Sequence, residues 1–222
     1  MEKNLPIKGI LFDLDGTLID TAPDFILSLN NLLSKHEKPH IDSSVIRSNV
    51  SDGSGKMIKI GFGIDEKNDQ FESLKKEFLI EYKKNLLKNS FLFDGIATLI
   101  DFLNLKHIDF GIVTNKPREY AEPLIKNIPE LNQLKVLVCS DDLSQSKPNP
   151  EGIIESLKRM GISSSECIYI GDHINDLKAG INAGTKIIAC YYGYSLSNRN
   201  NPYNCDSVDD AKELRDLINK YV

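Results

Sequence analysis

Four short apolar runs, each followed by polar residues, constrain the fold of this chain more than any other feature. The runs lie at residues 9–12, 110–113, 136–139 and 167–170. Short continuous apolar runs bounded by turn residues are typical of strands that are buried on both faces of a parallel sheet. Because parallel strands end along one edge of a sheet, we expect the polar residues that follow these runs to meet there.

Strand-like and helix-like segments alternate from about Asp94 to the C-terminus. This alternation predicts an α/β fold with a Rossmann-like parallel sheet and right-handed crossovers. We expect a fifth strand at residues 186–190 and a final amphipathic helix over residues 207–221.

Residues 20–91 break the alternation, and no strand-like run is obvious among them. Apolar residues recur there at helical spacing, as in Phe71, Leu74, Phe78 and Tyr82. We therefore predict two domains. Residues 1–19 and 92–222 form the core, and residues 20–91 form a helical domain inserted after the first strand.

Composition argues against several classes of protein. The net charge is 27 minus 32, or −5, which disfavours nucleic acid as the main partner. No apolar stretch approaches the ~20 residues that span a bilayer, so no membrane partner is expected. Residues 1–6 lead directly into the first strand, so we expect no signal peptide and a cytoplasmic location. The four cysteines include no Cys-x-x-Cys pair, and we expect them to be reduced.

The segment after the first strand carries residue types that suit phosphoryl chemistry. A carboxylate at Asp13, on the strand tip, can bind a metal ion and attack phosphorus. Asp15 lies two residues further on, where a carboxyl group can act as general acid and base. Gly16 allows close backbone approach, so that amides can point at phosphate oxygens.

The other strand ends supply complementary groups. Thr114 offers a neutral donor and Lys147 a positive charge for phosphate oxygens. Asp172 completes an oxygen-rich site of the kind that suits Mg²⁺. Each signal alone has an ordinary explanation, because Asp-x-Asp pairs are usually turns and a single lysine is usually solvated. Their shared position at strand ends of one sheet favours a common site.

Taken together, these segments resemble the haloacid dehalogenase superfamily over nearly the whole chain. The matching motifs are Asp13–Thr21, Val113–Pro117, Ser146–Pro150, and Gly171-Asp172 followed by Asp176, Ala179-Gly180 and Ala183-Gly184. The resemblance implies the haloacid dehalogenase fold, with a catalytic core and a helical cap. It also implies a phosphomonoester phosphatase that acts through an aspartyl-phosphate.

Site roles follow from the same resemblance. It implies that Asp13 is the nucleophile, that Asp15 is the acid and base, and that Thr114 and Lys147 hold the phosphoryl group. It implies a Mg²⁺ ion bound by three groups, namely the carboxylates of Asp13 and Asp172 and the backbone carbonyl of Asp15. Asp176 is expected just outside this set, orienting Lys147 or a water on the metal.

Within the superfamily, the helical insert is similar to the mobile cap of phosphoglycolate phosphatases. Substrate contacts are expected from Gly16 and Asn115 in the core and from Gly53, Ser54 and Lys56 in the cap. The cap residues are expected to read a second anionic group such as a carboxylate. A helix-start loop with solvated bases explains them equally well.

Some positions depart from the family pattern or have ordinary interpretations. The family often has glycine where Ser51 stands, and many relatives have serine or threonine where His173 stands. For Lys116 we prefer a solvated position at a helix start, with a role in neutralising the site as the alternative. We expect residues 191–194 to pack at the end of the fifth strand.

The alternatives are a phosphosugar mutase of the β-phosphoglucomutase type, and a pyrophosphatase or nucleotidase of the same superfamily. A non-catalytic binding module is disfavoured because no core motif residue is missing. The expected partner is a small phosphorylated metabolite, bound by a monomer or a homodimer.

Overall fold

A computed structural model describes residues 6–199 and 201–222. The chain divides into a larger unit, residues 1–18 and 92–222, and a smaller unit, residues 19–91. The N-terminal residues 1–5, where no signal peptide was expected, lie outside the described part. None of the described helices is both long and apolar enough to cross a membrane.

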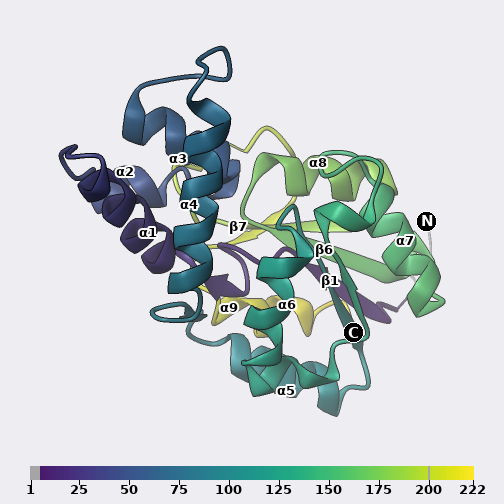
Figure 1. The fold of residues 1–222 in the computed structure, drawn as a ribbon. Coiled ribbons are helices and arrows are strands. Elements are labelled where there is room, and N and C mark those ends of the chain that lie inside the picture. The colour runs from purple at the N-terminus through teal and green to yellow at the C-terminus, as the bar shows by residue number, and fades with distance from the viewer. Residues whose placement is uncertain (1–5, 200) are drawn as a thin grey trace. The chain divides into compact units, whose positions relative to one another are not determined.

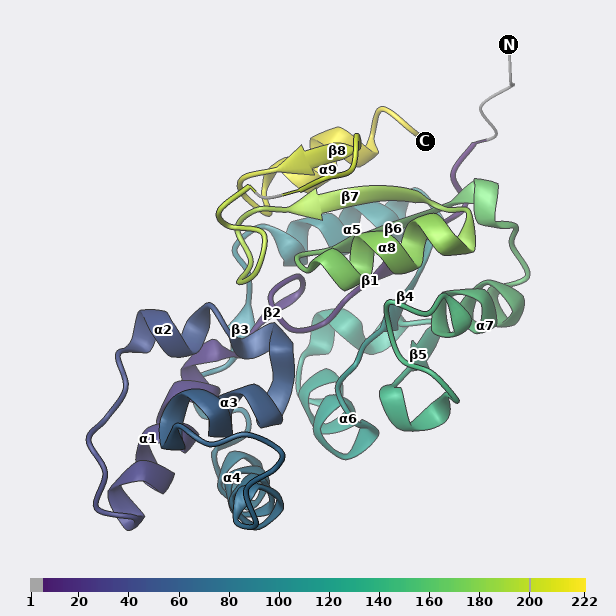
Figure 2. The same ribbon diagram turned by 90° about the horizontal axis from the view of Figure 1, so that it is seen from above.

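The larger unit is built on a six-stranded sheet in the order β5-β4-β1-β6-β7-β8 (Figures 1 and 2). Its strands are β1 (Gly9–Phe12), β4 (Asp109–Val113), β5 (Val136–Val138), β6 (Cys167–Gly171), β7 (Lys186–Cys190) and β8 (Asp206–Val208). Every neighbouring pair in this sheet runs parallel. The α/β fold class with a parallel sheet, predicted from the buried apolar runs, is confirmed.

Helices cover both faces of the sheet, with α7 and α8 on one face and α5 and α9 on the other (Figure 1). The helices of this unit are α5 (Ile96–Leu105), α6 (Arg118–Lys126), α7 (Glu151–Met160), α8 (Ile174–Ala183) and α9 (Glu213–Ile218). Short 3₁₀ helices lie at Pro129–Gln133, Ser140–Asp142 and Ser164–Glu166. Right-handed crossovers between these parallel strands stay a prediction.

The core of the larger unit includes a cluster of buried side chains drawn from the strands and from α7 and α8. Its members are Leu11, Val113, Val136, Val138, Ile153, Leu157, Cys167, Tyr169 and Ala179. Most are aliphatic, as expected for strands covered on both faces. Tyr169 differs, because its ring is buried in this cluster while its hydroxyl needs a polar partner.

The C-terminal prediction is wrong in one element. Residues 207–221 were expected to form one helix, but β8 joins the sheet beside β7, with Asp206 paired to Ile188. Helix α9 begins only at Glu213. Asp206 and Ser207 are exposed polar residues of an edge strand, so the segment lacks the apolar run that marked the other strands.

The smaller unit is mainly helical, as its periodicity predicted. Its helices are α1 (Ala22–Lys35), α2 (Ser43–Arg47), α3 (Gly53–Phe62) and α4 (Phe71–Asn85), with a 3₁₀ turn at Val50–Asp52. Aromatic rings of α1 and α4 form its centre. The ring centroid of Phe25 lies 4.4 Å from that of Tyr82 and 5.8 Å from that of Phe78.

Two very short strands, β2 (Ile19–Asp20) and β3 (Phe91–Leu92), pair at the ends of the insert. Neither strand was predicted, because a run of two residues is too short to show a strand pattern. Next to them, the backbone N–H of Phe93 donates to the carbonyl of Leu18 at 3.0 Å. The two chain segments that lead into and out of residues 19–91 are therefore side by side.

Candidate active site

Two of the predicted polar residues, Asp13 and Asp172, follow the carboxyl ends of neighbouring parallel strands. Phe12, the last residue of β1, is in register with Ile170 of β6. Asp13 follows Phe12 directly, and Asp172 comes two residues after Ile170. The backbone N–H of Asp13 also donates to the carbonyl of Ile170 at 2.9 Å, which fixes the start of the loop.

Lys147 is the centre of the site. Its ammonium lies 2.6 Å from Oδ1 of Asp13 and 2.7 Å from Oδ1 of Asp176. It also donates to the carbonyl of Val113 and the hydroxyl of Tyr169, both at 2.9 Å. The side chain is 4% exposed, so these contacts replace the water that a surface lysine would keep. An ordinary solvated lysine is thereby excluded.

Three buried carboxylates form a cluster, and two of them, Asp13 and Asp176, contact this ammonium. One oxygen each of Asp13, Asp172 and Asp176 lies within 4.8 Å of the others. Asp176 accepts from Lys147 on Oδ1 and from the backbone N–H of His173 on Oδ2 at 2.9 Å. Oδ1 of Asp176 therefore faces the ammonium of Lys147 at 2.7 Å, a contact that a cation ligand would have to give up.

The protonation behaviour of the cluster indicates a shortage of positive charge. Burial raises the pKa of Asp13 to about 7, with Lys147 opposing and Asp176 adding to the effect. Burial and the neighbouring carboxylates raise the pKa of Asp172 to about 8. Burial alone would lower the pKa of Lys147, but Asp13 and Asp176 raise it well above its usual value. Two neighbouring carboxylates with raised pKa values, Asp13 and Asp172, fit a hard divalent cation, which would stabilise their ionised forms.

Gly16 leaves room for the carboxylate of Asp172 because it has no side chain. Its φ is +85°, and a Cβ at this position would lie 2.5 Å from Oδ2 of Asp172. Any other residue would therefore meet both backbone strain and a collision with the carboxylate. The neighbouring hydroxyl of Thr17 donates to Oδ1 of Asp172 at 3.4 Å.

Asp15 forms an ion pair with a buried cation that the sequence analysis expected to be solvated. Lys116 places its ammonium 2.9 and 3.1 Å from the two carboxylate oxygens of Asp15. The Lys116 side chain is 5% exposed, so the expectation of a solvated lysine is wrong. The available signal was its position two residues after Thr114, at the same strand end.

Thr114 and Asn115 connect two of the motifs. The buried Thr114 hydroxyl accepts the backbone N–H of Lys116 at 3.1 Å. The Asn115 amide accepts from the N–H of Lys147 at 2.9 Å and donates to its carbonyl at 3.0 Å. Asn115 thus fixes the backbone of Lys147, and a contact of its side chain with substrate stays a prediction.

The predicted residues of the smaller unit lie at the start of α3. Gly53 has a φ of +79° with no atom near the position of a Cβ. Ser54 follows in the first turn of α3. The ammonium of Lys56 lies 4.0 Å from Oδ2 of Asp52. Their contact with a substrate stays a prediction.

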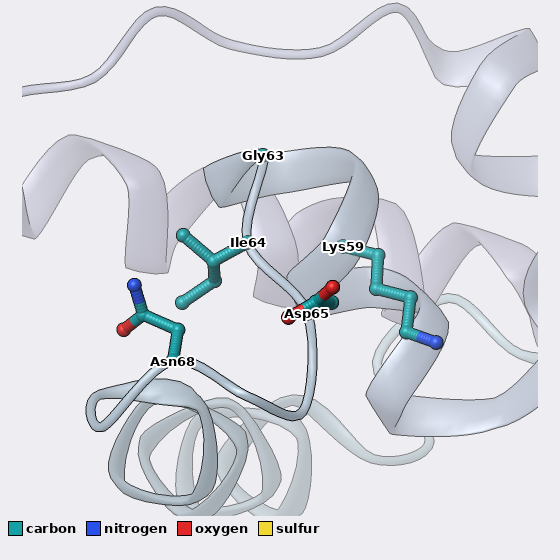
Figure 3. A pocket seen from close by; sticks show the side chains of 5 residues that line it. All are labelled: Lys59, Gly63, Ile64, Asp65 and Asn68. Carbon is teal, nitrogen blue, oxygen red and sulfur yellow. The ribbon is translucent and has the colours of Figure 1, made fainter.

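A surface hollow further along the same unit contains none of these residues. It is lined by Lys59, Gly63, Ile64, Asp65 and Asn68, in and after the last turns of α3 (Figure 3). Lys59 is paired with Glu66 at 2.6 Å. The hollow adds no group to the predicted site.

Two segments of the core have more specific roles than expected. His173 caps α8, since its Nδ1 accepts the N–H of Asn175 at 3.1 Å, the task that serine or threonine usually performs.

Residues 191–194 were expected only to pack. The N–H of Tyr194 instead donates to Oδ2 of Asp172 at 2.7 Å. A backbone N–H donor cannot be recognised from the type of residue that carries it.

Residues 10–190 match the family model described as haloacid dehalogenase-like hydrolase. The chain belongs to this family. The resemblance stated from the four motifs is confirmed, and the haloacid dehalogenase-like fold follows from the sheet order and its neighbours.

Curated relatives span nearly the whole chain. It is 36% identical over 215 residues to an N-acetylmuramic acid 6-phosphate phosphatase of Pseudomonas putida, which covers 96% of each chain. It is 34% identical over 191 residues to a phosphoglycolate phosphatase of Xanthomonas campestris pv. campestris, which covers 86% of each. The prediction of an enzyme, a phosphatase of this family, is confirmed by these relatives.

A solved structure supports the fold. A protein of Haemophilus somnus, described as a predicted phosphoglycolate phosphatase, superimposes with a TM-score of 0.82. The comparison covers 95% of this chain and 97% of the other, at 23% identity. At this identity the likeness concerns the fold alone.

Proposed function

We propose that the chain is a Mg²⁺-dependent phosphomonoester phosphatase that acts through an aspartyl-phosphate on a small phosphorylated metabolite. The observation that carries the proposal is the buried cluster in which Lys147 contacts Asp13 and Asp176 beside Asp172. Family membership supports it, because the cluster is made of the motif residues that the family resemblance singled out.

The chemistry that we propose divides between two aspartates. A carboxylate oxygen of Asp13 forms a bond to phosphorus while the bond from phosphorus to the leaving alcohol breaks. Asp15 gives its proton to the leaving oxygen and then takes a proton from the water that hydrolyses the aspartyl-phosphate. Lys116, paired with both oxygens of Asp15, holds that carboxylate in place.

Positive charge and donors assist the transfer. Lys147, fixed against Oδ1 of Asp13, and Thr114 would stabilise the negative phosphoryl oxygens. Asp13, Asp172 and the backbone carbonyl of Asp15 would hold the Mg²⁺ ion, and Asp176 would orient Lys147. When bound, the ion supplies the positive charge that the cluster lacks and screens the carboxylates from an anionic substrate.

Residues 19–91 are proposed to be a cap that excludes bulk water during turnover and opens for product release. Gly53, Ser54 and Lys56 would read a second anionic group of the substrate. The compounds named for the two relatives, phosphoglycolate and N-acetylmuramic acid 6-phosphate, both carry a carboxylate besides the phosphate ester. They are therefore the first substrates to test.

The test is a phosphate-release screen with the purified chain. The panel comprises phosphoglycolate, N-acetylmuramic acid 6-phosphate, hexose phosphates, nucleotides and pyrophosphate, each with Mg²⁺ or with EDTA. We expect Mg²⁺-dependent release from a carboxylate-bearing monoester, and none from the Asp13→Asn variant under matched conditions. Release that persists in that variant or in EDTA would refute the assignment.

Product analysis separates the alternatives. A phosphosugar mutase would convert a hexose phosphate to its isomer in the presence of a bisphosphate primer, without net phosphate release. A pyrophosphatase or nucleotidase would prefer those members of the panel. With the Asp15→Asn variant, intact-mass measurement should detect phosphorylated enzyme after addition of a good substrate, because the water step is blocked.

A further inference from the structure

The turn after β7, residues 191–196, wraps the carboxylate of Asp172. Oδ2 of Asp172 accepts the backbone N–H of Tyr194 at 2.7 Å and, at the longer distance of 3.4 Å, that of Ser195. The N–H of Leu196 donates to the backbone carbonyl of Asp172 at 3.0 Å. Three consecutive peptide groups therefore hold one aspartate, at both its side chain and its backbone.

This close wrapping depends on Gly193. A Cβ at position 193 would lie 2.2 Å from the Cβ of Asp172 and 2.5 Å from the carbonyl oxygen of Gly16. Neither atom is the far end of a flexible side chain, so the turn would have to move away. The hydroxyl of Tyr192 also donates to the carbonyl of Thr17 at 2.7 Å, which ties the turn to the loop after β1.

We propose that this turn makes Asp172 a ligand through one oxygen only, and thereby makes the site prefer Mg²⁺ to Ca²⁺. The inference rests on the proposed function, which places the cation at Asp172. Oδ2 accepts two peptide N–H groups, which direct its lone pairs at a fixed backbone and make it a poor ligand. Oδ1 accepts the hydroxyl of Thr17 at 3.4 Å, a donor that can rotate to admit a cation. Mg²⁺ requires octahedral geometry with short single-oxygen contacts, whereas Ca²⁺ accepts more oxygens and two-oxygen carboxylates.

The rigid position of the Asp172 carboxylate also favours Mg²⁺ over Ca²⁺. The peptide donors fix the Asp172 carboxylate before the ion arrives, so little reorganisation is needed for a small ion. A turn displaced by a methyl group at position 193 would release the carboxylate to rotate. The released carboxylate can offer both oxygens, which suits the larger ion and loses the geometry required by the smaller one.

The experiment is a calorimetric titration of Mg²⁺ and of Ca²⁺ into metal-free enzyme, comparing wild type with Gly193→Ala. We expect the Kd for Mg²⁺ to rise about 10–100-fold and that for Ca²⁺ to change less, so that the preference falls. Gly184→Ala is the control. It strains a left-handed residue, φ +77°, at the opposite end of α8 and should leave both Kd values unchanged.

A second measurement needs no variant. In ¹⁵N-labelled wild-type enzyme, the Tyr194 amide should exchange slowly without metal and should shift on addition of Mg²⁺ with the calorimetric midpoint. Fast exchange of this amide, or an unchanged ratio of Kd values in folded Gly193→Ala, would overturn the inference alone. A wild-type enzyme that binds neither ion would overturn the cation site itself and this inference with it.

Discussion

Replacing Asp13 by asparagine should abolish turnover and, in the absence of metal, make the protein more stable at pH 8. The amide has the shape of the carboxylate but cannot form an aspartyl-phosphate. It also removes the negative charge of one of the two buried carboxylates that contact the ammonium of Lys147. The substitution therefore distinguishes the contribution of Asp13 to turnover from its effect on the free energy of unfolding.

The magnitude follows from the pKa of Asp13, which burial raises from an ordinary 3.8 to about 7. A pKa difference of this size means that ionisation of Asp13 lowers the free energy of unfolding by at most about 4 kcal/mol. Because burial penalties relax in real proteins, we expect a gain of about 2 kcal/mol at pH 8. For a chain of this length, that is about 4–8 °C in Tm.

The pH dependence has a definite sign. A carboxyl group with a raised pKa binds its proton more tightly when folded, so the contribution of Asp13 to wild-type stability is fully present below about pH 4 and is lost as the pH rises through about 7. Asparagine does not titrate. The difference between variant and wild type should thus be large at pH 8 and nearly vanish at pH 4.

Thermal unfolding in EDTA at pH 4, 6 and 8, with initial rates measured in Mg²⁺, tests both halves of the prediction. Asp101→Asn is the control, because Asp101 is exposed on α5 and should shift stability by less than about 0.5 kcal/mol. An Asp13→Asn variant that is less stable than wild type at pH 8 in EDTA would refute the reasoning about the buried cluster.

Further outcomes concern the cations. Lys147→Met leaves the buried carboxylates without their ammonium, so urea unfolding at pH 8 should reveal a loss of about 3–5 kcal/mol, and kcat should fall at least about 100-fold. Lys116→Met releases Asp15, and steady-state rates should give a kcat lower by about 10–100-fold with little change in KM. Mg²⁺ at 100 times its Kd should stabilise wild type by about 2.7 kcal/mol in thermal melts, and Asp172→Asn should abolish that gain.

Each of these predictions has a contrary result. Wild-type stability in Lys147→Met would mean that the ammonium is not needed to balance the carboxylates. An unchanged kcat in Lys116→Met would remove Lys116 from the mechanism. A Tm that does not respond to Mg²⁺ would argue against the cation site.

Buried strands and their polar ends could be predicted from the sequence because each carries its own local pattern. Strand β1 is an uninterrupted apolar run that ends at Asp13, and β6 is another that leads to Asp172. Strand β8 was missed because an edge strand of three residues needs no apolar run. Its pairing with β7 is decided by tertiary contact rather than by its own residues.

The site could be predicted only as far as residue type reports on it. Asp13, Lys147 and Asp172 carry chemistry that a sequence displays. The hold of Lys116 on Asp15 depends on a side-chain direction, and that of Tyr194 on Asp172 uses a backbone N–H that every residue except proline has. Interactions of these two kinds become visible only when the chain is folded.

The hydrogen bond between Phe93 and Leu18 closes the larger unit across the ends of residues 19–91. Residues 19–91 are therefore an insertion whose two ends are already joined, and the backbone of the larger unit is continuous across that junction without them. Replacing residues 19–91 with a short turn should leave the six-stranded sheet able to form. An insert attached in this way can be exchanged or lengthened by evolution, and substrate choice can change while the reaction chemistry is inherited intact.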